Sequence, residues 1–126
     1  MLFKGYSAKV IDHFMEPRNN YEMTDADGCG QAGDPGCGDA VGIYIKVRED
    51  VITECSFVVM GCVGAIASSS MTTELVRGMT VEQARQLTPE MIADALDGLP
   101  ENKIHCSVLG AEAVKNAIAD FERKGV

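Results

Sequence analysis

Three short segments carry a cysteine beside other metal-ligating or glycine residues, and they lie far apart in the chain. They are Gly36-Cys37-Gly38-Asp39, Gly61-Cys62-Val63-Gly64 and His105-Cys106-Ser107. Thiolate, imidazole and carboxylate groups together can complete the coordination of a soft metal ion or an iron–sulfur cluster, but no single segment carries enough ligands alone. The fold must therefore bring three separate parts of the chain to one place. Glycine flanks two of the cysteines, which removes side-chain bulk and allows a positive φ.

The length and charge of the chain limit its architecture and its partners. With 126 residues, the chain is long enough for one compact core, so we expect a single domain over residues 1–126. The formal net charge is −8, and no run of lysine or arginine is present. Nucleic acid is therefore not an expected partner, because binding to phosphates needs a basic face. An acidic surface suits a basic protein partner instead.

The distribution of apolar residues predicts a location in the cytoplasm and no membrane span. No segment approaches the roughly 18 apolar residues of a spanning helix, and the N-terminus lacks the apolar stretch of a signal peptide. The chain has five cysteines, an odd number that does not favour a disulfide framework. We therefore expect reduced thiols that are available for chemistry.

The hydrophobic pattern predicts an α+β fold, with a small antiparallel sheet of about three strands packed against helices on one side and a long C-terminal helix. Two β-branched and aromatic runs separated by Arg48-Glu49-Asp50 indicate a hairpin. The expected elements are a helix over 6–15, a short strand near 28–32, hairpin strands over 41–47 and 51–60, a helix over 65–76, two short helices starting near Thr80 and Thr88, and a final helix that ends before Gly125.

Simple patterns suggest how the ligand candidates are presented. Cys37 and Asp39 are two residues apart, so they point to the same side if the chain is extended there. Cys62 lies at a predicted strand-to-helix junction, and Cys106 lies at a helix entry beside His105. The helix entry and the histidine predict a lowered pKa for the Cys106 thiol. The plainer alternatives are a turn at Cys37 and buried, structural thiols at the other two cysteines.

Three other candidate residues have simpler interpretations. Cys55 alternates with Phe57 and Val59 and is expected to be a small buried hydrophobic residue. Cys29 lies in a glycine-rich loop, where it is either a solvent-exposed thiol or an occasional extra ligand. His13, beside an apolar stripe in the first helix, is expected to be a packing or surface histidine.

The sequence carries no motif of a common enzyme class. It lacks an ordered Ser-His-Asp set, a Walker loop, a dinucleotide-binding fingerprint, an HExxH motif and a CxxC motif. Scattered ligands without catalytic machinery indicate an open platform for a metal ion or cluster.

In several sequence segments the chain resembles the IscU/NifU-type iron–sulfur cluster assembly scaffold family. The likeness covers nearly the whole chain and includes the order and spacing of the three cysteine segments. The segments that carry it are Glu16-Pro17-Arg18-Asn19, Cys37-Gly38-Asp39, Gly61-Cys62 followed by Gly64-Ala65-Ile66-Ala67-Ser68-Ser69-Ser70, and Lys103-Ile104-His105-Cys106-Ser107.

The resemblance implies a scaffold, not an enzyme, on which a [2Fe–2S] cluster is built from iron and from sulfur delivered by a cysteine desulfurase, and then passed to apoproteins. Cys37, Cys62 and Cys106 would be thiolate ligands, while Asp39 and His105 would compete for the remaining position. Cys106 would be the persulfide acceptor. Zinc can occupy the same site when no cluster is bound.

The chain departs from the family pattern in ways that bear on its partners. Val63 stands where glycine is usual, which predicts added bulk beside a ligand. Leu99-Pro100-Glu101 lacks the second proline of the Leu-Pro-Pro motif read by a specialised Hsp70-type chaperone, so the sequence does not support that partner. The alternative function is a zinc-bound sulfur-transfer protein of the SufU type, but that branch lacks a histidine at the position of His105. A closed structural zinc site is a third possibility.

Overall fold

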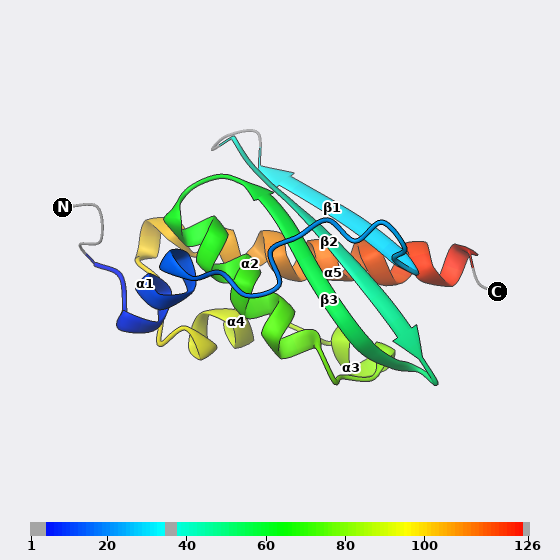
Figure 1. Cartoon of the computed structure of the whole chain (residues 1–126). Helices are drawn as coiled ribbons and strands as arrows, with labels where there is room; N and C mark the ends of the chain where they lie inside the picture. Colours follow the sequence, from blue (N-terminus) through cyan, green and yellow to red (C-terminus); the bar gives the residue numbers. More distant parts are fainter. Residues whose placement is uncertain (1–4, 35–37, 125–126) are drawn as a thin grey trace.

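The computed structural model of the protein describes residues 5–34 and 38–124 (Figure 1). Within them, an N-terminal helix precedes a three-stranded sheet, and further helices follow the sheet. The elements are α1 (Ala8–Met15), β1 (Gly28–Asp34), β2 (Asp39–Arg48), β3 (Val51–Met60), α2 (Val63–Val76), α3 (Val81–Arg85), α4 (Pro89–Ala95), the 3-10 helix η1 (Glu101–Lys103) and α5 (His105–Lys124).

The three strands form an antiparallel sheet in the order β1-β2-β3. Glu49 and Asp50 connect β2 to β3, and both have positive φ, 50° and 68°, as in the two-residue turns that suit the twist of a hairpin. Ile43 of β2 is paired with Phe57 of β3, and both are fully buried. The alternation along β2 and β3 therefore turns one face of the sheet toward the core, which confirms the predicted hairpin.

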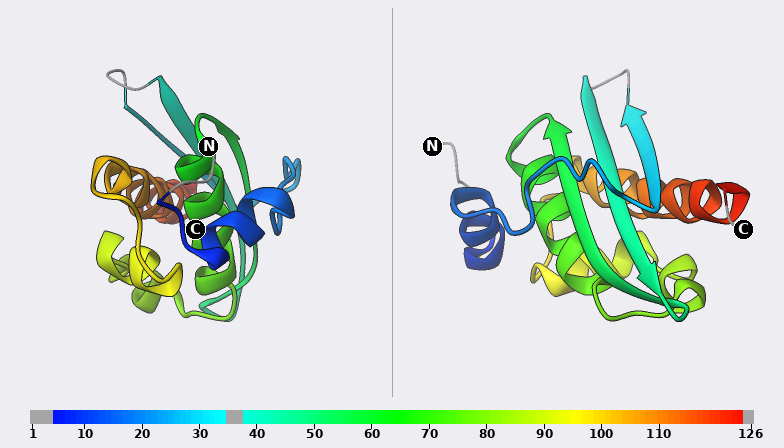
Figure 2. Two further views of the ribbon diagram at one scale, coloured as in Figure 1. Left: turned by 90° about the vertical axis from the view of Figure 1, so that its left-hand side faces the viewer. Right: turned by 45° about the vertical axis from the view of Figure 1, so that its right-hand side comes forward.

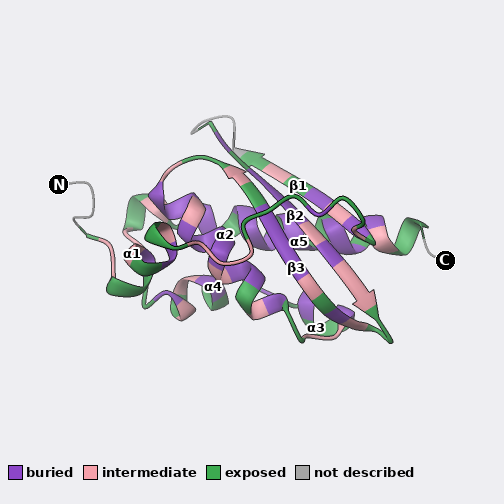
Figure 3. Cartoon of the chain, in the orientation of Figure 1, coloured by how far each residue is buried: buried purple, intermediate pink, exposed green. Residues whose placement is uncertain are grey.

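Helices cover that face of the sheet. Figure 2 shows α2 and α5 side by side behind the strands, with α1 against α2 and with α3 and α4 beside α5. Helix α2 is buried on nearly all sides, as its colouring in Figure 3 shows, because it lies between the sheet, α1 and α5. Small residues such as Ala67 and Ser68, both fully buried, allow this close packing.

The outer face of the sheet is crossed by the segment between α1 and β1 (Figure 1). Phe57 N–H donates to Asn19 O at one end of the segment, and Asp27 N–H donates to Ile45 O at the other. Met23 is 5% exposed. This segment is therefore ordered against the sheet.

Strand β1 is longer than the short strand predicted near 28–32. Its close packing against α5 depends on two of its glycines. A Cβ atom on Gly28 or Gly30 would overlap the backbone of α5 at Ala117, so the missing side chains let the strand lie directly on the helix. Polar side chains of α5 also cover the outer edge of the strand. Cys29 N–H donates to Asp120, and the Asn116 side chain donates to Gln31 O.

The two short helices predicted to start near Thr80 and Thr88 are confirmed, and each begins with a side-chain cap. The Thr80 side chain and Gln83 form a capping box at α3. The Thr88 side chain accepts a hydrogen bond from Met91 N–H at α4, with Pro89 at the first helical position. No helix among residues 5–34 and 38–124 has the length and apolar character needed to cross a membrane.

Candidate metal centre

Three elements place their first residues around one point. Asp39 is the first residue of β2, Cys62 is the N-cap of α2, and Cys106 lies in the first turn of α5. Cys62 has extended backbone angles, and its thiol makes no capping hydrogen bond to its own helix. The three residues form a group whose ligand atoms all lie within 4.8 Å of one another.

The distances in this group match the edges of a tetrahedral metal site. Cys62 Sγ lies 3.8 Å from Cys106 Sγ and 3.7 Å from Asp39 Oδ2, and Cys106 Sγ lies 3.9 Å from the same carboxylate oxygen. Metal–sulfur bonds of about 2.3 Å in a tetrahedron place two sulfurs about 3.8 Å apart. Soft thiolates with one carboxylate suit zinc and iron.

His105 lies beside two members of this group, on its more open side, but is not itself part of the group. Its Nε2 atom lies 3.6 Å from Asp39 Oδ2 and 3.7 Å from Cys106 Sγ. The imidazole is 31% exposed, whereas the Asp39 side chain is 4% exposed. The structure thus gathers three of the five predicted ligand residues into one group and places His105 beside two of them. The fifth, Cys37, lies outside the described residues.

Burial, rather than the helix entry, controls the acidity of Cys106 in the metal-free protein. Burial raises the pKa of the Cys106 thiol, and the neighbouring Cys62 and Asp39 raise it further. The lowered pKa predicted from the sequence is therefore wrong for this state, because the residue is only 1% exposed and lies beside Cys62 and Asp39, whose effect outweighs that of Lys103. Metal binding must displace the thiol proton, so the affinity of the site depends on pH.

Lys103 and Tyr6 are neighbours of the site that were not among the predicted site residues. The pKa of Lys103 is raised, chiefly by the charge of the nearby Cys62 thiolate and then by Tyr6 and Cys106. Burial raises the pKa of Tyr6, and Lys103 opposes that effect. Lys103 is the last residue of η1, two positions before α5 begins at His105, and this closeness in sequence to Cys106 was the available signal. Its approach to Cys62 depends on tertiary packing.

Glycines in the first two cysteine segments serve different purposes. Gly38 has a φ of 75°, a conformation that favours glycine, and a Cβ atom there would have nothing within 4 Å. Gly64 instead provides space, since a Cβ atom there would lie 3.2 Å from Cys106 Sγ. Val63 packs in the hydrophobic core and is 8% exposed. The predicted added bulk at this position is thus accommodated by the core.

The remaining candidates lie away from this group. Cys55 is 1% exposed in the core, and burial raises the pKa of its thiol to about 12, which confirms the predicted buried role. His13 is also buried, with Nδ1 2.8 Å from Ser70 Oγ between α1 and α2, and is a packing histidine. Cys29 lies in strand β1 opposite Tyr44, so its predicted place in a loop is wrong, and burial raises the pKa of its thiol.

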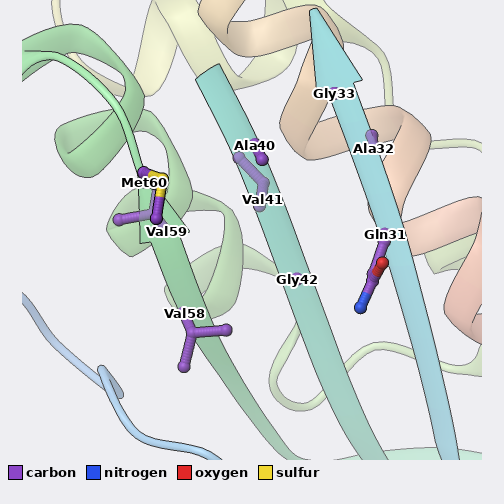
Figure 4. A pocket seen from close by; sticks show the side chains of 9 residues that line it. All are labelled: Gln31, Ala32, Gly33, Ala40, Val41, Gly42, Val58, Val59 and Met60. Atoms are coloured by element: carbon purple, nitrogen blue, oxygen red, sulfur yellow. The ribbon is translucent and has the colours of Figure 1, made fainter. Parts of the chain in front are cut away.

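A shallow hollow of about 510 Å³ lies on the outer face of the sheet near the site (Figure 4). Its walls include Val58, Met60 and Gln31, and its floor is the β2 backbone around Gly42. Ala40 faces this hollow, and strand alternation turns the adjacent Asp39 to the opposite face. The hollow and the ligand group are therefore separate features.

Comparison with known proteins relates this geometry to a family. The family model described as NifU-like N terminal domain matches residues 5–126. The iron-sulfur cluster assembly scaffold protein IscU 1 of Archaeoglobus fulgidus is 50% identical over 119 residues, which cover 94% of this chain and 78% of the relative. The scaffold protein IscU of Escherichia coli is 44% identical over 124 residues, which cover 95% of this chain and 96% of the relative.

A solved structure supports the fold. The crystal structure of a nitrogen-fixing NifU-like protein (N-terminal) from Brucella abortus superposes with a TM-score of 0.76 at 20% identity, covering 98% of both chains. At that identity the likeness concerns the fold alone. Together with the family match and the identities to the scaffold proteins, it leads to one conclusion: this chain belongs to the IscU/NifU-type iron–sulfur cluster assembly scaffold family.

Proposed function

We propose that this protein is a scaffold, not an enzyme, on which a [2Fe–2S] cluster is assembled and from which it is transferred to apoproteins. The observation that carries the proposal is the convergence of Asp39, Cys62 and Cys106 from three different elements. The names of relatives that are 44–50% identical over nearly the whole chain support it. We propose that residues 1–126 act as one scaffold domain.

Each donor has a distinct part in holding this cargo. Cys37, Cys62 and Cys106 supply thiolates, and Asp39 and His105 compete for the remaining position. A carboxylate is a harder ligand than thiolate and binds iron–sulfur iron less firmly. Asp39 therefore keeps the cluster labile enough to leave. The 3.6 Å separation of His105 Nε2 from Asp39 Oδ2 supports a direct exchange between the two donors at one position.

Sulfur reaches the site on Cys106. A cysteine desulfurase carries the sulfur as a persulfide, and the Cys106 thiolate attacks its outer sulfur atom. A new sulfur–sulfur bond forms on Cys106, and the desulfurase thiolate leaves. His105, with Nε2 3.7 Å from Cys106 Sγ, is placed to accept the thiol proton before this attack. The acidic chain, with a net charge of −8, suits a basic docking face on the desulfurase.

A zinc-bound sulfur relay of the SufU type is the second candidate. The near-tetrahedral spacing of the donors favours it, since zinc prefers that geometry. In this reading one cysteine relays persulfide while zinc organises the others, and no cluster forms. His105 beside Cys106 favours the scaffold, because the SufU branch lacks a histidine at this position.

Anaerobic reconstitution with iron, cysteine and a desulfurase distinguishes the two functions. The scaffold should develop the visible absorption of a [2Fe–2S] cluster, and Cys37→Ala, Cys62→Ala and Cys106→Ala should each abolish stable assembly. Cys29→Ala is the matched control, because this cysteine lies outside the ligand group. Mass spectrometry after desulfurase treatment should locate added sulfur on Cys106. Bound zinc that resists replacement, with no cluster absorption, would instead identify the relay.

Partners beyond the desulfurase follow from cargo transfer. The recipients are apoproteins that present free thiols to the cluster. The sequence Leu99-Pro100-Glu101 does not support a dedicated Hsp70-type chaperone as a partner. Location in the cytoplasm stays a prediction.

A further inference from the structure

Gly61, between the end of β3 and Cys62, forms a wall of the space that holds the Asp39 carboxylate. A Cβ atom built on Gly61 would lie 2.6 Å from Asp39 Oδ1 and 3.0 Å from Asp39 Cγ. The other carboxylate oxygen, Oδ2, faces Cys62 Sγ at 3.7 Å and Cys106 Sγ at 3.9 Å. The carboxylate therefore lies between the bare α-carbon of Gly61 and the two thiols.

The backbone conformation does not explain why glycine stands at this position. Among the described glycines, positive φ occurs at Gly5, Gly38, Gly78 and Gly98, and not at Gly61. Gly61 is also exposed to solvent, so no burial in the core excludes a side chain there. An L-residue could adopt this backbone. The Asp39 carboxylate, with the Cβ of Ala65 at 3.0 Å from the same point, is what occupies the space.

We infer that Gly61 is a positioning residue for Asp39, in that its missing side chain allows the carboxylate to reach the two thiols. A methyl group at position 61 would press on the end of a flexible side chain, so the carboxylate moves more easily than the backbone. Since the Asp39 side chain is only 4% exposed, that movement takes it out of the ligand group. The substitution should therefore change the site more than the fold.

The test measures metal binding without a cluster. The coupling between Gly61 and Asp39 does not depend on the proposed function. Only its expected effect on the rate of cluster release rests on that function. Metal-free wild type, Gly61→Ala, Asp39→Ala and the double variant are titrated anaerobically with Co²⁺, whose absorption reports thiolate coordination. We expect Gly61→Ala to weaken Co²⁺ binding by about 10-fold or more, the size usual for loss of an orienting contact. In the Asp39→Ala background, Gly61→Ala should change the affinity by less than about 2-fold, because the carboxylate is gone and only the contact with Ala65 remains.

Gly33→Ala is the matched control. A Cβ atom there would lie 3.5 Å from the backbone oxygen of Asp39, an ordinary contact, and Gly33 is exposed in β1. This variant should bind Co²⁺ like wild type, with an unchanged circular dichroism spectrum.

The outcomes separate the explanations. Wild-type Co²⁺ affinity in Gly61→Ala, or an equal loss with and without Asp39, would overturn the inference. If Gly61→Ala fails to fold while the double variant folds, collision with the carboxylate is the cause and the inference is supported; failure of both would overturn it. Wild type that binds Co²⁺ but assembles no cluster would contradict the proposed function and leave the Gly61–Asp39 coupling to be judged by the cobalt data.

Discussion

Zinc should raise the melting temperature of this protein. The size of the rise can be estimated from the zinc concentration relative to Kd and from the unfolding entropy of the chain. Asp39, Cys62 and Cys106 come from β2, α2 and α5 and are separated by 23 and 44 residues in the chain. The unfolded chain therefore holds no preformed site, and nearly all the binding free energy stabilises the folded state. At a free zinc concentration of 100 times Kd, this linkage adds about 2.7 kcal/mol.

The corresponding temperature shift follows from the size of the chain. An unfolding entropy of about 2.1 cal/mol/K per residue gives about 0.26 kcal/mol/K for 126 residues, and hence a rise of about 10 °C. A variant that binds zinc 100-fold more weakly keeps only about 0.4 kcal/mol at the same zinc concentration, or about 2 °C. Cys62→Ala should behave in this way.

Differential scanning calorimetry in a zinc buffer, at fixed pH and protein concentration, measures the shift. Cys29→Ala is the matched control, since it removes a thiol outside the ligand group and should keep the full shift. Equal melting temperatures for metal-free and zinc-loaded wild type would refute the reasoning. So would a loss of the shift in Cys29→Ala, which would assign the stabilisation to another site.

Three further predictions concern release, pH dependence and packing. Asp39→Ala should assemble a cluster but pass it to an apo-ferredoxin more slowly, because the weak carboxylate ligand is gone; transfer as fast as from wild type, with cluster content matched, would remove Asp39 from the release step. Burial and then Arg18 lower the pKa of His13 from its ordinary 6.5, so the neutral form is favoured by folding. Its contribution is complete above pH 6.5 and is lost as the pH falls below that value; urea unfolding across this range should show a smaller loss of stability in His13→Gln, and parallel curves for the two proteins would contradict the assignment. Gly30→Ala should destabilise the protein by about 3 kcal/mol or more, because its Cβ would overlap the α5 backbone at Ala117; a melting temperature like that of Gly33→Ala would show that β1 can move away from the helix.

The sequence predicted the elements whose stabilisation is local. The hairpin of β2 and β3 follows from alternating β-branched residues and a short polar turn, and both short helices carry complete caps at Thr80 and Thr88. Strand β1 has no such pattern, since its sequence is Gly-Cys-Gly-Gln-Ala-Gly-Asp. Its strand conformation depends on contact with α5 through Gly28 and Gly30, which only the tertiary structure provides.

For the site, too, the sequence predicted what local patterns determine and not what depends on tertiary packing. The sequence indicated which segments meet, because cysteines beside glycine, aspartate and histidine are unusual in a core. It did not predict the raised pKa of Cys106, because the position at a helix entry carries no information on how deeply the residue is buried. Nor did it predict the proximity of Lys103 to Cys62 or of Gly61 to Asp39, since both depend on how η1 and the end of β3 pack against their neighbours.

The four described candidate ligand residues differ in burial, so the site has a buried side and a side that is partly open to solvent. Asp39 and Cys106 are 5% and 1% exposed, while His105 and Cys62 are partly open to solvent. Removing water around acidic groups is costly, so the metal-free site opposes folding and a bound cation offsets that cost. We expect an incoming acceptor thiol to meet the Cys62 and His105 side first, because the carboxylate is covered. If Asp39 promotes release through the weakness of its own bond, as we propose, then the exposed donors provide the place where the acceptor enters.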